Sequence, residues 1–142
     1  MEIVRLAPGD EAKVHAASHL FDGPARAGET ARTLREPTHH LLLAYEDGEP
    51  AGFVSGVEVS HPDKPTEMML YELGVDEAHR RRGIGRALVR SLADLAAERG
   101  CSSMFVLTER GNDAAMATYA FGDPVREDDF VMFTWKVGAT GA

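Results

Sequence analysis

The stretch YELGVDEAHRRRGIGRAL, residues 71–88, decides the fold of this chain. Its pattern predicts a strand that ends near Val75, a polar loop, and a helix that begins at about Gly83. Gly83 and Gly85 have no Cβ, so the backbone can approach a ligand closely there. The unpaired N–H groups of a first helical turn favour anions, and the loop arginines add charge-assisted donors. The stretch therefore predicts a phosphate cradle at the start of the helix.

Composition sets the class of protein. The chain has 142 residues, of which 44% are hydrophobic and 27% charged, with a formal net charge of -8. These values predict one globular domain over residues 1–142 and argue against nucleic-acid binding. No stretch reaches the ~18 apolar residues of a membrane span, and residues 1–5 lack a signal-peptide pattern, so we expect a cytoplasmic protein without a membrane partner. Five arginines and no acidic residue lie between Arg80 and Arg90, a basic island suited to one compact anion.

Alternation, helical spacing and turn residues predict the element order β-α-α-β-β-β-α-β-α-β. Antiparallel strands that lead into one βαβ unit imply a mixed, mostly antiparallel sheet with helices on both faces, in the α/β (α+β) class. The expected strands are residues 2–6, 40–45, 51–59, 67–75, 103–108 and 130–137, and the expected helices are residues 11–21, 25–35, 83–99 and 113–121.

Three kinds of phosphate loop can be compared with the cradle. A Walker A loop needs Gly-Lys-Ser or Gly-Lys-Thr, which the chain lacks. A dinucleotide fingerprint needs a third glycine where Leu88 stands. The motif Arg-x-x-Gly-x-Gly does fit, as RRRGIG at residues 80–85. Between a Leu-x-Val strand end and an amphipathic helix, it resembles the acetyl-CoA pyrophosphate loop of the Gcn5-related N-acetyltransferase (GNAT) family. The alternative is a solvated, basic helix start.

A second motif, NDAAMATY at residues 112–119, resembles the Asn-x-x-Ala-x-x-x-Tyr helix of the same family. Asn112 can cap this helix, and Tyr119 lies about two turns later on the same face. The family usually continues Tyr-x-x-x-Gly-Phe, whereas Gly122 comes one residue early here. The resemblance covers essentially the whole chain. It implies the GNAT fold, with a six- to seven-stranded sheet and about four helices on both faces, and acetyl-CoA as the cosubstrate.

Within the family, Tyr71-Glu72-Leu73-x-Val75, with His79-Arg80-Arg81 downstream, looks most like the small aminoglycoside 3-N-acetyltransferases. Their strand carries Tyr-Asp-Leu-x-Val before Glu-His-Arg-Arg, so a longer carboxylate stands at position 72 here. Residues 125–128 and 131–133 also resemble theirs, whereas Asp129 and Phe130 differ. The resemblance implies direct transfer of an acetyl group from acetyl-CoA to an amine of an aminoglycoside antibiotic, an activity that would confer resistance.

The resemblance also assigns roles to residues. Glu72 is the candidate base, directly or through water, or an anchor for a cationic substrate, and Tyr119 protonates or hydrogen-bonds the departing thiolate. A bulge would part the 67–75 strand from the 103–108 strand and admit the pantetheine arm, with the Val75 amide as oxyanion donor. The residues expected to bind acetyl-CoA are Leu73, Val75, Arg80, Arg81, Arg82, Gly83, Ile84, Gly85, Arg86, Asn112, Ala115 and Tyr119.

Acidic residues are the expected contacts of a cationic substrate. Asp128 and Asp129 are the first candidates because they lie between the Tyr119 helix and the last expected strand. Further candidates are Asp22, Glu29, Glu58 and Glu109. We expect no metal, because His39, His40 and His79 lack ligand spacing, and we expect Cys101 to be a buried small hydrophobe.

Other interpretations stay open at this stage. The same fold could acetylate another small amine or a peptide amine, or it could bind acyl-CoA without catalysis. Glu72 could be a solvated strand residue, and Tyr119 could be a core tyrosine. A small cationic amine is the expected partner, and a homodimer is a further possibility.

Overall fold

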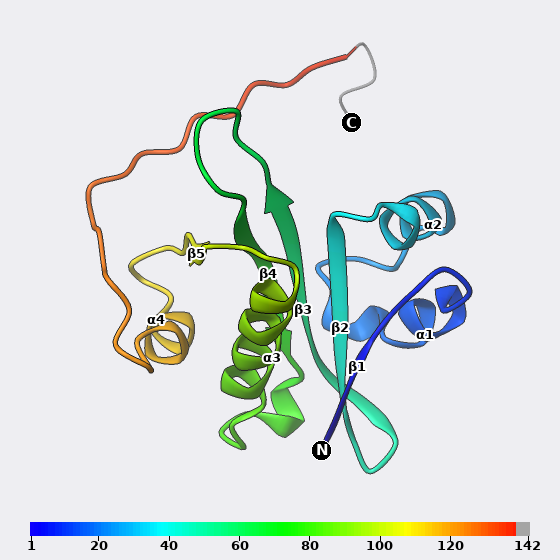
Figure 1. The fold of residues 1–142 in the computed structure, drawn as a ribbon. Coiled ribbons are helices and arrows are strands. Elements are labelled where there is room, and N and C mark those ends of the chain that lie inside the picture. The colour runs from blue at the N-terminus through cyan, green and yellow to red at the C-terminus, as the bar shows by residue number, and fades with distance from the viewer. Residues whose placement is uncertain (139–142) are drawn as a thin grey trace.

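The structure is a computed structural model that describes residues 1–138 (Figure 1). Its sheet has five strands in the order β1-β2-β3-β4-β5. The first four pair antiparallel, and β5 pairs parallel with β4. The strands are β1 (Glu2–Arg5), β2 (His39–Glu46), β3 (Glu49–Val59), β4 (Glu67–Val75) and β5 (Ser103–Val106). The helices are α1 (Glu11–Ala16), α2 (Ala27–Arg35), α3 (Ile84–Glu98) and α4 (Asp113–Tyr119), with 3₁₀ turns η1 (Ser18–Leu20) and η2 (Glu77–His79).

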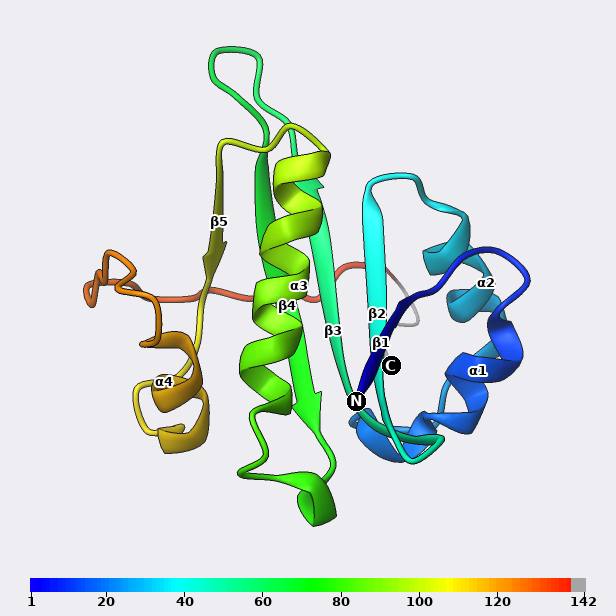
Figure 2. The same ribbon diagram turned by 60° about the horizontal axis from the view of Figure 1, so that its bottom comes forward.

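Two apolar layers hold the sheet between its helices (Figure 2). Strand β2 contributes to both layers: Leu42 and Ala44 pack with the α3 leucines, whereas Leu41 and Leu43 pack with α1 and α2. Successive strand residues face opposite sides, so a strand covered on both faces is a continuous apolar run. Cys101, which the sequence predicted to be buried, is partly buried and packs at the edge of the α3 layer. None of the described helices is long and apolar enough to cross a bilayer.

The class and most elements agree with the sequence-based expectations. Strand β4 has the expected bounds, and Gly83 is the N-cap of α3. The expected first helix is instead a short α-helix followed by the turn η1.

The expected strand over residues 130–137 is wrong, and the sheet has five strands instead of six or seven. Its sequence has strand character, but a strand also needs a hydrogen-bonding neighbour. The chain turns away from β5 after α4: both Gly122 and Asp123 have positive φ, at 79° and 61°. Residues 123–137 then run as an extended segment outside the sheet (Figures 1 and 2).

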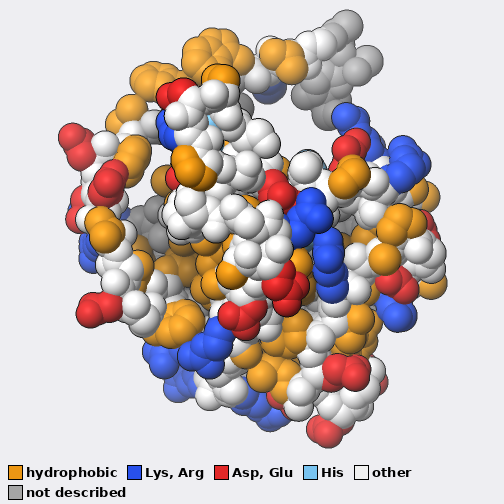
Figure 3. Space-filling model, in the orientation of Figure 1, with side chains coloured by type: hydrophobic (Ala, Val, Ile, Leu, Met, Phe, Trp, Pro, Cys, Tyr) orange, Lys and Arg blue, Asp and Glu red, His pale blue; other side chains and the backbone are white. Residues whose placement is uncertain are grey.

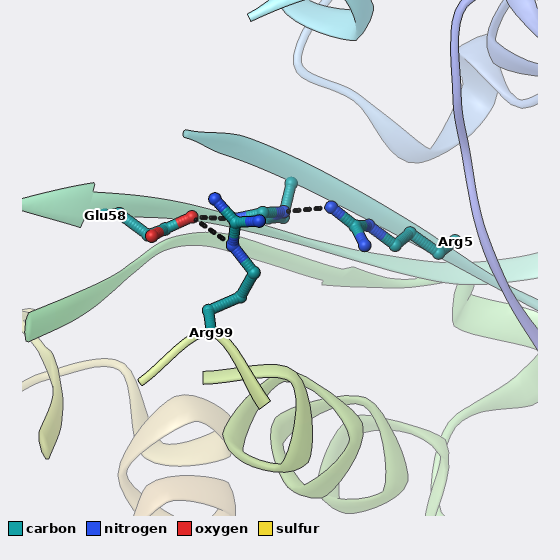
Figure 4. Close-up of polar contacts among 4 residues, drawn as sticks. Arg5, Glu58 and Arg99 are labelled. Carbon is teal, nitrogen blue, oxygen red and sulfur yellow. Dashed lines mark hydrogen bonds and ion pairs between the residues drawn. The ribbon is translucent and has the colours of Figure 1, made fainter. Parts of the chain in front are cut away.

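A polar network centred on the buried His40 side chain joins the sheet to the end of α3 (Figure 4). The Arg5 guanidinium lies 3.0 Å from Nδ1 of His40, and Nε2 of His40 lies 2.7 Å from Oε2 of Glu58. Nε of Arg99, the C-cap of α3, donates to the same Glu58 oxygen at 2.9 Å. Since a guanidinium only donates, Nδ1 of His40 must accept, and Nε2–H donates to Glu58. His40 is therefore the neutral tautomer that carries its proton on Nε2.

Burial sets the protonation of this network. It lowers the pKa of His40, against the opposing hydrogen bond to Glu58. Burial alone would raise the pKa of Glu58, but the hydrogen bonds from His40 and Arg99 outweigh it, and the pKa is lowered. Glu58, a further candidate for the substrate cleft, is thus engaged by His40 and Arg99 in this network, and His40 has the structural role expected of it.

We predict that His40→Leu destabilises the fold by about 1–3 kcal/mol, because the buried Glu58 carboxylate loses one of its donors. Denaturant unfolding at pH 7.5 measures this change. His39→Leu is the matched control, because His39 is exposed on the same strand, and it should change the free energy of unfolding by less than about 0.5 kcal/mol.

The same pair of variants gives a pH test. In the unfolded chain, His40 binds a proton below about pH 6.5, whereas in the folded protein burial lowers its pKa and the ring stays neutral to a lower pH. Stability should therefore fall as the pH drops below this value, and more steeply in the natural protein than in His40→Leu. Equal slopes would contradict a neutral His40.

Candidate active site

One extra residue in β4 decides which way Glu72 points. In the pairing with β3, Ser55 lies opposite Glu72 but the next residue, Gly56, lies opposite Leu70, so Tyr71 is bulged out of the ladder. Before the bulge, Leu70 faces α3; after it, Leu73 does. Without the bulge, Glu72 would point toward α3. The bulge instead directs Glu72 to the face that carries α1 and α2, and the Ser55 hydroxyl accepts the Glu72 N–H at 3.1 Å.

The turn η1 brings a second carboxylate to Glu72. Gly74 lies on the same face as Glu72, and a Cβ there would lie 2.7 Å from the Phe53 ring and 3.0 Å from the Leu20 carbonyl. Only glycine lets η1 come this close to β4. Asp22 follows two residues after Leu20. Partial burial raises the pKa of Glu72, and the charge of Asp22 raises it further. The two acids therefore form a pair that favours cations and disfavours ionisation of Glu72.

The backbone of β4 beside Glu72 has no strand partner on the edge that faces away from β3. Strands β4 and β5 pair only from Glu67↔Ser103 to Leu70↔Val106, and then they diverge (Figure 2). The Asp76 N–H bonds to the Ala51 carbonyl of β3, at 2.8 Å. Because successive N–H groups of a strand point to opposite edges, those of Leu73 and Val75 point away from β3, toward the parted side. They are available to an extended ligand or to a developing oxyanion, the roles that the resemblance implies for them.

The expected cradle lies where β4 leads into α3. Arg81 and Gly83 both have positive φ, at 66° and 79°, and Gly83 caps the helix. A Cβ at Gly83 would meet nothing within 4 Å, so space is open above the first turn. The N–H groups of Ile84, Gly85 and Arg86 have no helical partner there. Within residues 1–138, Arg80, Arg81 and Arg82 form no ion pair, so their charge is free for an anion.

Helix α4 packs beside the cradle. A Cβ at Gly85 would lie 3.4 Å from Thr118 on α4 and 3.7 Å from Val75 on β4, so three elements converge here. The Asn112 side chain accepts the Ala115 N–H at 3.1 Å and caps α4, which leaves its amide N–H₂ free. Tyr119, at the end of α4, packs against the α3 layer, and burial raises the pKa of its hydroxyl. It keeps its proton and can donate it.

The remaining acids lie elsewhere. Asp128 pairs with Arg126 at 2.8 Å and with Arg110 at 3.8 Å, and its exposed neighbour Asp129 makes no ion pair among the described residues. The acid that raises the pKa of Glu72 is Asp22, which the sequence offered only as a further candidate. A bulge does occur in the 67–75 strand, as the resemblance implied, but it interrupts the pairing of β4 with β3. The contact of Ser55 with the Glu72 N–H was missed, because it depends on this register. Residues 1–138 hold no cluster of His, Cys, Asp and Glu suited to a metal.

Comparison with known proteins supplies the family. The family model described as "Acetyltransferase (GNAT) family" matches residues 10–122. The chain therefore belongs to the GNAT acetyltransferase family, and the resemblance inferred from the cradle and the Asn112 helix is confirmed.

Relatives within this family differ in substrate. The N-alpha-acetyltransferase RimI of Mycobacterium tuberculosis is 33% identical over 108 residues, which cover 76% of this chain and 66% of RimI. This is slightly less than two thirds of that relative's length. An aminoglycoside acetyltransferase from an uncultured soil metagenomic sample, solved with sisomicin, superposes with a TM-score of 0.88 at 20% identity, over 96% of each chain. A second soil metagenomic aminoglycoside acetyltransferase gives a TM-score of 0.80 at 26% identity, over 96% of this chain and 98% of its own.

We predict that Asp22→Asn lowers the pKa of Glu72, because it removes one of the two causes that raise it. The ¹³C chemical shift of the Glu72 carboxyl, followed by NMR across a pH titration, measures the change. Asp47→Asn is the control, since it removes the same charge from the β2–β3 turn. A Glu72 titration that is identical in all three proteins would contradict the Asp22–Glu72 pair.

Proposed function

We propose that the protein transfers the acetyl group of acetyl-CoA to an amine of a small polycationic substrate, and that aminoglycosides are this substrate class. The observation that carries the proposal is the Asp22–Glu72 pair beside the open backbone edge of Leu73 and Val75. It unites a site for positive charge, a proton acceptor and an oxyanion donor. The cradle on the same strand–helix unit supplies the site for the diphosphate of the cosubstrate.

Each part of the site has a step in this reaction. The cradle and the Leu73 and Val75 backbone hold acetyl-CoA, with the free Asn112 amide as a further contact to the pantetheine arm. Glu72 takes a proton from the substrate ammonium, and its raised pKa makes it a better base than a glutamate with an ordinary pKa. The neutral amine attacks the thioester carbonyl carbon. The carbonyl oxygen, which becomes negative, accepts a hydrogen bond from the Val75 N–H. The C–S bond then breaks, and Tyr119 donates its proton to the thiolate. The nitrogen that is now bonded to the acetyl carbon loses its extra proton, which passes through solvent to the Tyr119 oxygen and restores the neutral tyrosine.

Charge and structural likeness together favour aminoglycosides. Burial and the charge of Asp22 both disfavour the ionised form of Glu72, so the two carboxylates gain most from a ligand that brings several ammonium groups. The two soil aminoglycoside acetyltransferases match nearly the whole chain. The alternative substrate is a peptide amine, which the likeness to RimI favours. A peptide N-terminus carries one ammonium, so it makes less use of the paired acids.

A parallel substrate screen tests this choice. Thiol release from acetyl-CoA is followed with sisomicin, gentamicin, spermidine and an alanine-terminated peptide. We expect the highest kcat/KM with an aminoglycoside. A higher value with the peptide would support the RimI-like alternative, and no turnover with any amine would favour a non-catalytic acyl-CoA-binding module.

Two sets of variants separate chemistry from cosubstrate binding. Glu72→Gln should lower kcat by about 100-fold or more, because general-base catalysis contributes about 10²–10⁴-fold, with little change in the Kd for acetyl-CoA. Arg81→Ala with Arg82→Ala should instead weaken acetyl-CoA binding about 10-fold or more. Calorimetric titration measures Kd, and the thiol assay measures kcat. Lys64→Ala, in the β3–β4 loop, is the control for loss of positive charge. If Glu72→Gln weakened acetyl-CoA binding and the arginine double variant did not, both assignments would be wrong.

A further inference from the structure

Large apolar side chains are exposed in two places among the described residues. Most follow the segment after α4, and Figure 3 shows hydrophobic side chains along its arc at the rim of the molecule. Outside that segment and Met1, the exposed set consists of Tyr71, Phe105 and Leu107, which are 62%, 37% and 60% exposed. These three lie on β4, on β5 and directly after β5. Single exposed apolar residues are normal, whereas a group on two neighbouring strands indicates a surface for a ligand or a partner.

The bulge in β4 turns Tyr71 to the same face of the sheet as Glu72. Leu70 and Leu73 both pack in the α3 layer, and two residues lie between them. Side chains alternate along each half of the strand, so Tyr71 and Glu72 both lie on the opposite face. In a regular strand, two consecutive residues would lie on opposite faces. The bulge therefore places an exposed aromatic ring directly beside the Asp22–Glu72 pair.

Strand β5 adds a second ring to this face. Met104 and Val106 pack against the α3 layer, so Phe105 between them lies on the opposite face. Phe105 pairs with Met69, which lies two residues before Tyr71 and on the same face of β4. Tyr71 and Phe105 are thus diagonal neighbours, a separation that aromatic side chains can span. Among the described residues, neither ring stacks on another aromatic ring. We call Tyr71 and Phe105 the aromatic platform.

The helices on this face leave the aromatic platform uncovered and give it an acidic border. Within residues 1–138, the apolar layer under α1 and α2 takes its strand residues from β1, β2 and β3. The turn η1 approaches β4 at Gly74 and brings Asp22 to Glu72 there. The platform is therefore an apolar floor with two carboxylates along one side. This combination suits a ligand with an apolar face and a positively charged rim.

A saturated amino-sugar ring has that shape. Its two faces carry C–H groups, and ammonium and hydroxyl groups surround its rim. The C–H face can lie on an aromatic ring, and an ammonium group is attracted to the electron-rich face of the same ring. A linear polyamine covers little of a ring and loses rotational freedom along its whole length when it binds. The platform therefore favours an amine that is carried on a ring.

We propose that the aromatic platform holds a sugar ring of the substrate and thereby selects ring-borne amines over linear polyamines. The inference rests on the proposed function and adds to it the residues that choose among polycations. Tyr71 is the main contact, because it is the more exposed ring and lies next to Glu72. The platform acts on the affinity and the position of the substrate, whereas Glu72 acts on its proton. Tyr71 and Phe105 are thus specificity residues.

The first test is calorimetric titration of the protein saturated with CoA, which carries no acetyl group, so the amine binds without turnover. Tyr71→Leu should weaken the binding of sisomicin roughly 5- to 10-fold, because the ring contact is lost. Tyr71→Phe keeps the ring and should stay within about 2-fold of the natural protein, and spermidine should change by less than about 2-fold in both variants. Phe130→Leu is the matched control, because Phe130 is 63% exposed but lies on the segment after α4. It should leave both affinities unchanged.

The thiol-release assay gives a second readout. Tyr71→Leu and Phe105→Leu should both raise the KM for sisomicin and change kcat less, since neither side chain takes part in proton or acetyl transfer. Circular dichroism of Tyr71→Leu should match the natural protein, because the ring lies outside both apolar layers.

The outcomes separate this inference from the proposed function. If the natural protein and Tyr71→Leu bound sisomicin equally, the platform would be wrong and the proposed function would stand. An equal loss of sisomicin and spermidine affinity would also overturn the selection of ring-borne amines. If the natural protein bound no polycation, the proposed function would fail and the platform with it. A changed oligomeric state of Tyr71→Leu in light scattering, with unchanged sisomicin affinity, would assign the ring to a contact between copies, against the proposal.

Discussion

The bulge at Tyr71 is the constraint on which the site depends. A regular β4 would direct Glu72 to the α3 side, where Leu73 now packs. The extra residue reverses the alternation halfway along the strand. The reversal comes directly after the last pair between β4 and β5, so the outer backbone edge is released at the same point. One local irregularity therefore orients the acidic side chain and leaves the adjacent N–H groups free.

The sheet also separates two opposite charges. The loop arginines lie at the start of α3, on one face, and the Asp22–Glu72 pair faces the α1 and α2 side. In the proposed function, an anionic cosubstrate and a cationic substrate approach from opposite sides and meet at the edge of β4. Close contact between the charges would have neutralised them as ion pairs. Their separation lets a net acidic chain keep a local anion site.

The sequence was sufficient for features that rest on short-range patterns. The β4 bounds, the Gly83 cap, the Asn112 cap and the two-sided sheet follow from glycine spacing, capping and alternation. Features that depend on contacts distant in sequence were not accessible. The proximity of Asp22 to Glu72 requires the space that Gly74 leaves for η1. The pattern at residues 130–137 carried strand propensity but no information on which edge it would pair with.

The network around His40 has a mechanical consequence for the opposite end of α3. This helix of 15 residues is a rod of about 22 Å. Arg99 fastens one tip to the sheet through Glu58, and the cradle occupies the other tip. Because the helix is stiff, the direction set at the Arg99 end also sets the position of the N–H groups at the Gly83 end. Arg99 therefore bears on the geometry of the candidate anion site from the opposite tip of the helix.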